Sequence, residues 1–325
     1  MITKDTKKIQ TATNSRLPDF MIIGAMKAGT STLHHILASH PDVFIPDNEI
    51  FFYDMDDLIQ HPYFFLGTKH RWYFPTFDEH LSRYLNWYES LFEKARKDQL
   101  VGEDSTTYLA SRNVPERISR LNPEVKLIVT LRDPAARTYS HYWHLVKAGR
   151  GIYNFEDTLQ IQPQSLIERS LYKKQIEHFL KFIPKERFYF IIFEEFIRHM
   201  EKITQEICKF LGVSSESIDF NRLNTHQNPT MLPRHLKLQL WHNRILILKN
   251  KHVNVNRLID APTLQKKTNY LKSAINRSHR RINPVQQKKP PAMKASTKTF
   301  LNDYFSKENK GLSELINKNT DEFWY

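Results

Sequence analysis

The sequence has 325 residues with a formal net charge of +13, and its 40% hydrophobic and 12% aromatic residues exclude a generally disordered chain. It has no run of 18 apolar residues, and its polar N-terminus lacks the apolar centre of a signal peptide, so we expect no membrane span and no secretion. The single cysteine, Cys208, excludes an internal disulfide and a cysteine-based zinc site, which favours a cytoplasmic protein without a metal.

Apolar runs alternate with helical patterns along most of the chain. Strands are predicted at 18–24, 100–104, 125–133 and 187–193, and helices at 30–41, 78–97, 134–149, 170–184, 201–213 and 296–316. This alternation predicts an α/β fold with a central parallel sheet covered by helices on both faces. We expect residues 1–16 to form a flexible arm and residues 17–325 to form a single domain.

Positive charge is concentrated in the last third of the chain. Residues 234–310 hold 18 Lys and Arg against three acids, a net of +15, so the remainder carries about −2. Such a region either binds a polyanion or forms a solvated basic face. Without a recognisable nucleic-acid motif, nucleic acid is not the expected partner. Residues 250–294 lack clear periodicity, which predicts a long basic loop, either disordered or part of the cofactor or acceptor site.

The stretch "FMIIGAMKAGTSTLHHIL" (20–37) has the outline of a phosphate-binding loop between a strand and a helix. Backbone N–H groups between Gly24 and Gly29, together with the helix N-terminus, favour an anion. The lysine of this loop is Lys27, three residues before Thr30, instead of directly before a Ser or Thr. That displacement disfavours a P-loop kinase that uses Mg²⁺. The alternative to a phosphate-binding role is an ordinary structural turn between a strand and a helix.

A second phosphate site is predicted after the strand at 125–133. Arg132 ends this strand, and Ser140 lies one to two turns into the next helix. Both belong to the carboxyl edge of the predicted sheet, where open α/β sheets bind ligands. An arginine fork and a hydroxyl suit a phosphate group.

The two phosphate elements together resemble those of sulfotransferases that use 3′-phosphoadenosine 5′-phosphosulfate (PAPS). Further blocks resemble the same family, closest to the branch of heparan sulfate 3-O- and N-sulfotransferases and their bacterial relatives: "PDNEIFFYD", "GEDSTTYL", "NVPERISRLNPEVKLIVTLRDP", "RSLYKKQIEHFLKFIP" and "FLNDYFSKENKGLSELI". The resemblance runs from about Leu17 to the C-terminus. It implies a P-loop-like sulfotransferase fold and transfer of a sulfuryl group from PAPS without metal.

The resemblance also implies roles for individual residues. Glu49 would be the general base, and Lys27 would neutralise charge on the departing phosphate. The remaining cofactor-binding residues would be Ala28, Gly29, Thr30, Ser31, Thr32, Arg132, Ser140, Phe193, Lys288 and Lys289. Phe193 is expected either to stack on adenine or to be a core aromatic of a strand. Lys288 or Lys289 would replace an arginine of the family's C-terminal loop, whose glycine is missing here.

The acceptor is less well specified. Asp104 stands where the heparan enzymes carry lysine, and residues 50–90 hold six acids, three Lys or Arg and thirteen aromatics. We therefore expect a small neutral or cationic metabolite, such as a guanidinium-containing natural product, unless these aromatics are simply core residues. A carbohydrate or glycolipid is the alternative acceptor. A P-loop kinase and a non-catalytic nucleotide-binding protein are the rival classes, and the oligomeric state is not predicted.

Overall fold

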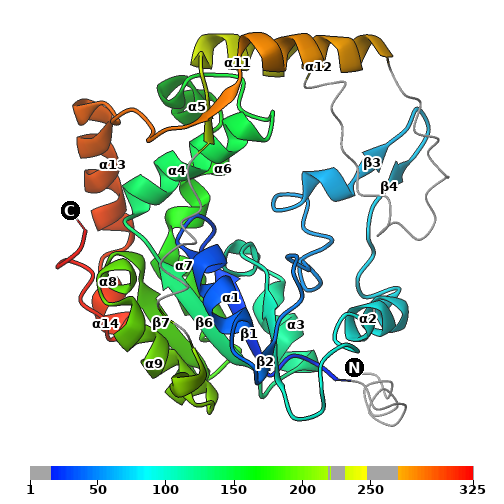
Figure 1. The fold of residues 1–325 in the computed structure, drawn as a ribbon, viewed down its shortest axis with the longest axis vertical. Helices are drawn as coiled ribbons and strands as arrows, with labels where there is room; N and C mark the ends of the chain where they lie inside the picture. Colours follow the sequence, from blue (N-terminus) through cyan, green and yellow to red (C-terminus); the bar gives the residue numbers. More distant parts are fainter. Residues whose placement is uncertain (1–15, 219, 221–230, 247–269, 325) are drawn as a thin grey trace.

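The computed structural model describes residues 16–218, 220, 231–246 and 270–324 (Figure 1). Its centre is a sheet of five parallel strands in the order β2-β5-β1-β6-β7. The strands are β1 (Phe20–Gly24), β2 (Val43–Phe44), β5 (Leu100–Asp104), β6 (Lys126–Leu131) and β7 (Phe188–Ile192). Every residue of β1 is buried, as expected for the central strand of a sheet covered on both faces. The predicted parallel sheet is confirmed.

Side chains of the central strands alternate between two hydrophobic clusters, because successive residues of a strand point to opposite faces. Phe20 and Ile22 pack with α1 (Thr30–Ala38), α8 (Phe193–Arg198) and α9 (Met200–Leu211). Met21 and Ile23 belong to the opposite cluster. That cluster contains residues of α2 (Leu81–Ser90), α3 (Val114–Leu121), α7 (Tyr172–Phe179) and α14 (Leu312–Ile316). Helices therefore cover both faces, as predicted.

A third cluster surrounds the long helix that follows β6. Tyr142, Trp143 and Val146 of α4 (Pro134–Lys147) pack with residues of α5 (Phe155–Ile161), α6 (Pro163–Ile167), α11 (Leu236–Leu246) and α13 (Ala295–Glu308). Figure 1 shows α11 and α12 (Tyr270–Ile282) lying across one end of the molecule, beyond α4. The short antiparallel pairs are β3 (Leu66–Gly67) with β4 (Trp72–Tyr73), and β8 (Met231–Pro233) with β9 (Val285–Gln287). The 3₁₀ turns are η2 (Pro62–Phe64), η3 (Tyr108–Ala110), η4 (Glu168–Ser170), η5 (Lys185–Arg187) and η6 (Ser215–Ser217).

Several predicted boundaries were wrong. The strand expected at 187–193 ends at Ile192, and Phe193 begins α8. The helix expected at 296–316 is divided by Gly311, whose φ of +83° ends the helical path between α13 and α14. The helix expected at 78–97 extends only from Leu81 to Ser90.

The prediction of a basic loop at 250–294 was also wrong for the second half of that range. Residues 270–282 form α12, and 285–287 form β9, whereas 250–269 lie outside the described residues. Tertiary contact stabilises α12: its His279 ring stacks on His242 of α11 with 3.8 Å between ring centroids. Of the predicted N-terminal arm, the structure describes Arg16, whose guanidinium donates a 2.6 Å hydrogen bond to the Arg96 carbonyl.

Gly102 offers a test of the packing between β5 and β1. It is the register partner of Phe20, and a Cβ at Gly102 would overlap the buried Phe20 ring. Gly102→Ala should therefore lower the free energy of unfolding by about 1–3 kcal/mol, measured by denaturant titration. In the Phe20→Leu background the same change should cost clearly less, because the overlapping ring atoms are absent. Equal costs in both backgrounds would contradict this packing.

Candidate active site

The loop between β1 and α1 exposes a set of backbone N–H groups. Lys27 has φ +72° and Gly29 has φ +89°, so the chain turns sharply before α1 begins at Thr30. Within the described part of the chain, no acceptor binds the N–H groups of residues 26, 27, 29, 30 and 31. Converging N–H groups at a helix N-terminus form an anion site. The loop predicted from its glycines is therefore shaped to hold a phosphate.

Phe193 and Arg132 close one side of this loop. A Cβ at Gly29 would lie 2.6 Å from Cδ2 of Phe193, so only glycine lets the ring approach the loop. The Arg132 guanidinium lies 4.9 Å from the centre of the Phe193 ring and donates a 3.2 Å hydrogen bond to the Lys27 carbonyl. Phe193 is half-buried beside the loop, so it is neither a strand residue nor part of the buried core.

Lys27 and Glu49 are brought within electrostatic reach of each other. Burial lowers the pKa of Lys27, Arg132 and Lys147 lower it further, and Glu49 acts in the opposite direction. Glu49 Oε1 accepts a 3.1 Å hydrogen bond from the Thr106 backbone N–H and another from the Thr106 hydroxyl. Lys27 and Glu49 therefore lie close enough for their charges to interact.

The protein around Glu49 favours its protonated form. Desolvation is the largest cause of its raised pKa, and the nearby Asp104 carboxylate raises the pKa further, whereas the bonds from Thr106 lower it in part. Asp104 is itself buried, with its Oδ2 3.4 Å from His34 Nδ1. A carboxyl group with a raised pKa is suited to take a proton near neutral pH.

A buried network positions the segment that follows Glu49. Tyr108 Oη accepts hydrogen bonds from the N–H groups of Phe52 and Tyr53, and Ser105 Oγ accepts those of Ile50 and Phe51. Both hydroxyls donate to Glu103 Oε1, at 2.5 and 2.7 Å. Tyr88 donates to the other oxygen of Glu103. One carboxylate at the end of β5 thus orders four consecutive peptide groups next to Glu49.

Two arginines and a histidine that sequence reasoning missed lie near the phosphate loop, where Arg169 contacts Met26. His141, Arg150 and Arg169 border a pocket of about 200 Å³. Arg169 donates to Gln60 Oε1 and to Met26 Sδ, both at 2.9 Å, and within the described residues neither Arg150 nor Arg169 has a carboxylate partner. Burial and the surrounding cations lower the pKa of His144 to about 4. In the sequence, the available signal for this group of basic residues was the pair His141 and His144 on α4, directly after Ser140.

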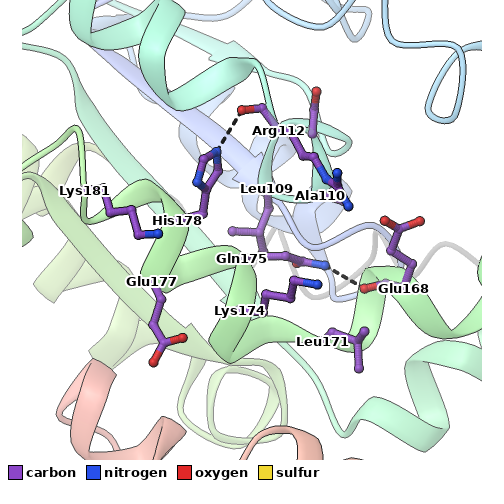
Figure 2. Close-up of a pocket in the computed structure, with 11 residues that line it drawn as sticks. Leu109, Ala110, Arg112, Glu168, Leu171, Lys174, Gln175, Glu177, His178 and Lys181 are labelled. Carbon is purple, nitrogen blue, oxygen red and sulfur yellow. Dashed lines mark hydrogen bonds between the residues drawn. The ribbon is translucent and has the colours of Figure 1, made fainter.

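A larger pocket of about 510 Å³ lies elsewhere, between η3 and α7 (Figure 2). Leu109, Ala110 and Leu171 form part of its wall, together with Lys174 of α7 and Lys181, which follows α7. Glu168 of η4 borders both pockets. Neither the residues of the phosphate loop nor Glu49 lines this pocket, so the pocket with the larger volume is not the one next to the candidate site.

The remaining predicted cofactor residues have different outcomes. Ser140 is half-buried on α4, and its hydroxyl has no hydrogen-bond partner within the described residues. Lys288 and Lys289 are exposed directly after β9. The chain then returns to α4, where Tyr139 donates a 2.9 Å hydrogen bond to the Pro291 carbonyl. The chain directly after these lysines therefore contacts α4, and their role in cofactor binding stays a prediction.

The reasoning that favoured a cationic acceptor is corrected by the structure. The acids of residues 50–90 are largely engaged: Asp56 forms a bidentate pair with Arg117, and Asp78 pairs with Arg120 at 2.6 Å. Asp57 accepts from the N–H of Ile59 and from the Ser111 hydroxyl. Six of the thirteen aromatics are buried core residues. The acidic and aromatic composition of this segment therefore reflects ion pairs and packing.

Neither a metal site nor a membrane span is found in the described regions. No cluster of three or more His, Cys, Asp or Glu side chains there is arranged to hold a metal ion. None of the helices described has the length and apolar character needed to cross a bilayer.

Glu103 should make stability depend on pH. Burial raises its pKa from 4.5 to about 7, so the folded protein holds this proton more tightly than the unfolded chain. The contribution of Glu103 should therefore fall by about 3 kcal/mol as the pH rises from 4.5 to 7. Glu103→Gln should remove this part of the pH dependence in denaturant titrations. An unchanged profile would contradict the raised pKa.

Comparison with known proteins agrees with this geometry. The profile of the sulfotransferase family matches residues 18–217, which are 200 of the 325 residues. Heparan sulfate glucosamine 3-O-sulfotransferase 5 of Mus musculus is 27% identical over 218 residues, covering 63% of this chain and 56% of that protein. Heparan sulfate glucosamine 3-O-sulfotransferase 3B1 of Mus musculus is 29% identical over 210 residues, covering 62% and 48%. The chain thus spans about half the length of these curated relatives.

Among solved structures, the sulfotransferase from Alicyclobacillus acidocaldarius has the same fold. Its TM-score is 0.60 at 22% identity, and the match covers 95% of this chain and 99% of that one. The match of the family profile to more than half of the residues confirms the resemblance seen in the sequence. The chain belongs to the sulfotransferase family.

Proposed function

We propose that the protein transfers a sulfuryl group from PAPS to a hydroxyl group of an acceptor. The observation that carries this proposal is the meeting of three elements at the carboxyl edge of the sheet: the open N–H groups of the loop, Lys27, and Glu49. A kinase that depends on Mg²⁺ fits these elements poorly, because Lys27 is displaced and the loop is followed by hydroxyls instead of a lysine.

The residues present fit PAPS as cofactor. The five open N–H groups at the start of α1, with the hydroxyls of Thr30, Ser31 and Thr32, would hold the 5′-phosphosulfate. Arg132, whose buried Nε has no partner within the described residues, and Ser140 would hold the 3′-phosphate. Phe193 offers a ring face beside the loop. PAPS would supply the sulfuryl group and leave as 3′-phosphoadenosine 5′-phosphate (PAP).

The chain's own groups would then perform two tasks. Glu49 would take the proton of the acceptor hydroxyl as the new bond between oxygen and sulfur forms. Lys27 would balance the negative charge that develops on the departing phosphate oxygen. Thr106, by its two hydrogen bonds to Oε1, would leave the other oxygen of Glu49 free to face the acceptor.

The cations of the smaller pocket favour an acceptor that carries a negative group. Exposed Arg150 and half-buried Arg169 lack carboxylate partners within the described chain, and guanidinium groups without such a partner favour anionic ligands. A hydroxyl-rich acceptor with an acidic group, such as an acidic carbohydrate, fits this lining better than a guanidinium compound. The relatives are named as 3-O-sulfotransferases of heparan sulfate glucosamine, and these names also favour a carbohydrate acceptor.

The cofactor assignment predicts the effect of removing Arg132. Arg132→Ala should weaken PAP binding about 10- to 100-fold in calorimetry without metal, because a charged hydrogen bond contributes about 1.5–3 kcal/mol. Arg112→Ala, which removes an exposed arginine at the other pocket, should leave PAP binding unchanged. Absence of PAP binding by the wild type, with binding of ATP and Mg²⁺ instead, would favour the kinase.

The assignment of Glu49 predicts both a rate and a pH profile. Glu49→Gln should lower the sulfation rate about 10²- to 10⁴-fold while PAP still binds. In the wild type, the rate should rise with pH as Glu49 loses its proton, and because its pKa is raised this rise should lie above 4.5. Asp47→Asn, which changes an exposed carboxylate nearby, is the matched control. Normal turnover by Glu49→Gln would rule out this base.

The acceptor class can be tested with three probes and radiolabelled PAPS. We expect 4-nitrophenyl β-D-glucuronide to be sulfated faster than the matched neutral glucoside, and agmatine, a guanidinium amine, to be slowest. Arg150→Gln and Arg169→Gln should reduce the preference for the glucuronide over the glucoside. If agmatine reacts fastest, the acceptor is cationic and the proposed class is wrong.

A further inference from the structure

The two helices at one end of the molecule expose apolar side chains. Figure 1 shows α11 and α12 along this end, with no other described helix or strand beyond them in this view. Trp241 of α11 and Ile282 of α12 are 61% and 64% exposed, and Ile245 and Ile275 are exposed as well. Trp241 and Ile245 are four residues apart, and Ile275 and Ile282 are seven apart. At this spacing each pair lies on one side of its helix.

A groove between the two helices joins these side chains. Its volume is about 330 Å³, and Trp241, Ile275 and Ile282 border it together with Leu238 and Ala274. Contiguous apolar residues at the surface of a protein, bordered by polar ones, mark a site of contact with another molecule. We call the exposed side of α11 and α12 around this groove the α11–α12 face.

Polar contacts join the two helices to each other. The His242 ring stacks on His279, and His242 Nε2 lies 3.1 Å from Asn276 Oδ1. His279 Nε2 lies 3.0 Å from Gln239 Oε1. An amphipathic helix ordinarily packs its apolar side against the rest of the protein. Here the side that holds Trp241 is exposed instead, so these apolar residues are available to a partner.

Positive charge surrounds the α11–α12 face. Residues 231–246 and 270–289 contain nine Lys and Arg and no Asp or Glu. Arg280 and Arg281 of α12 are exposed, as are Lys237 and Arg244 of α11. A second copy of the chain on this face would bring like charges together, which opposes self-association. The face therefore fits a partner that is both anionic and apolar.

We propose that the α11–α12 face docks on the surface of an anionic lipid bilayer. The tryptophan and isoleucines would enter the boundary between headgroups and acyl chains, where exposed apolar helix faces bind. The arginines and lysines would contact the anionic headgroups. A nucleic acid would match the charges but would leave the isoleucines in water. The inference is independent of the proposed function, because it concerns a face outside the candidate active site.

Sedimentation of the full chain with vesicles tests the electrostatic part. We expect binding to an equal mixture of phosphatidylcholine and phosphatidylglycerol, and little binding to phosphatidylcholine alone. Raising the salt from about 0.1 to 1 M should weaken binding, because the Debye length falls from about 10 to 3 Å. Arg280→Gln combined with Arg281→Gln should lower the partition coefficient about 25-fold, since each cation near the surface contributes about fivefold.

The matched control for the double arginine variant is Lys202→Gln combined with Lys209→Gln. Both lysines are exposed on α9, which covers the sheet away from α11 and α12 (Figure 1). The control removes the same charge and should leave the partition coefficient unchanged. Equal losses in the two double variants would show adsorption by net charge alone and would overturn a specific face.

The apolar part is tested by a pair of exposed isoleucines. Ile282→Ser should lower the partition coefficient about tenfold, because a large apolar side chain no longer leaves water. Ile197→Ser removes an exposed isoleucine of α8 and should leave vesicle binding unchanged. If Ile282→Ser binds as tightly as Ile197→Ser, the apolar side chains do not enter the bilayer and the proposal is wrong.

Tryptophan fluorescence reports insertion directly. Phospholipids with brominated acyl chains quench a tryptophan that reaches them, so the wild type should be quenched on binding. Trp241→Phe should still bind the mixed vesicles but lose most of this quenching. Trp72→Phe removes another exposed tryptophan, one that does not border the groove, and should keep the quenching. Quenching that persists in Trp241→Phe would contradict the proposed orientation.

The remaining outcomes are also decisive. Absence of binding to the mixed vesicles would overturn the proposal and leave the proposed function untouched, because no cofactor or acceptor is used. Binding of duplex DNA or heparin without binding of vesicles, lost in the double arginine variant, would assign this face to a polyanion. Circular dichroism checks that each variant is folded. If Ile282→Ser does not fold, the dependence of wild-type binding on lipid and salt, with the quenching of Trp241, decides the question.

Discussion

The buried carboxylate of Glu103 connects the sheet to the candidate active site. It accepts hydrogen bonds from Ser105, Tyr108 and Tyr88, and the first two of these hydroxyls hold the backbone of the segment after Glu49. Burying a carboxylate is costly unless its oxygens are satisfied by donors. The three hydroxyls meet this requirement and at the same time order a stretch that has no helix or strand hydrogen bonds of its own. The geometry of the Glu49 segment therefore depends on a strand residue beneath it.

The charge of the site explains why it suits anionic ligands. Lys27, Arg132, Lys147, Arg150 and Arg169 lie close enough to perturb one another or the histidines among them. Burial is the main cause of the lowered pKa of Lys27 and of His144, and repulsion from the neighbouring cations lowers both further. A ligand with several phosphate or sulfate charges would relieve the repulsion. Glu49 and the buried Asp54 supply the nearby negative charge in the arrangement described.

In the proposed function, the β1–α1 loop, Arg132 and Phe193 would bind the cofactor, whereas Arg150 and Arg169 would face the acceptor. Thr106 and Thr107 bind Glu49 and Asp54, respectively. Two adjacent threonines after β5 thus hold two carboxylates, one of which is the candidate base.

The sequence by itself predicted the parallel sheet, the phosphate loop with Lys27, and Arg132 at the end of a strand, whereas Glu49 was singled out by the family resemblance. Continuous apolar runs ending in glycine, and an arginine at the end of a strand, are local patterns that survive folding because the backbone imposes them. The carboxyl ends of parallel strands meet at one edge, so these residues could be expected to converge. Phe193 lies beside the loop at Gly29, although its strand boundary was wrong, and its role toward a cofactor stays a prediction.

Only the tertiary structure decided which charges remain available to a ligand. The composition of residues 50–90 suggested an acidic site for a neutral or cationic acceptor. Asp56 and Asp78 are, however, paired with arginines of α3, more than 30 residues away in sequence. Likewise, Arg150 and Arg169 come from separate turns and were not recognised, because their importance depends on having no carboxylate partner among the described residues. Pairing between distant side chains is not encoded in any local pattern, so the acceptor side became visible only in the folded chain.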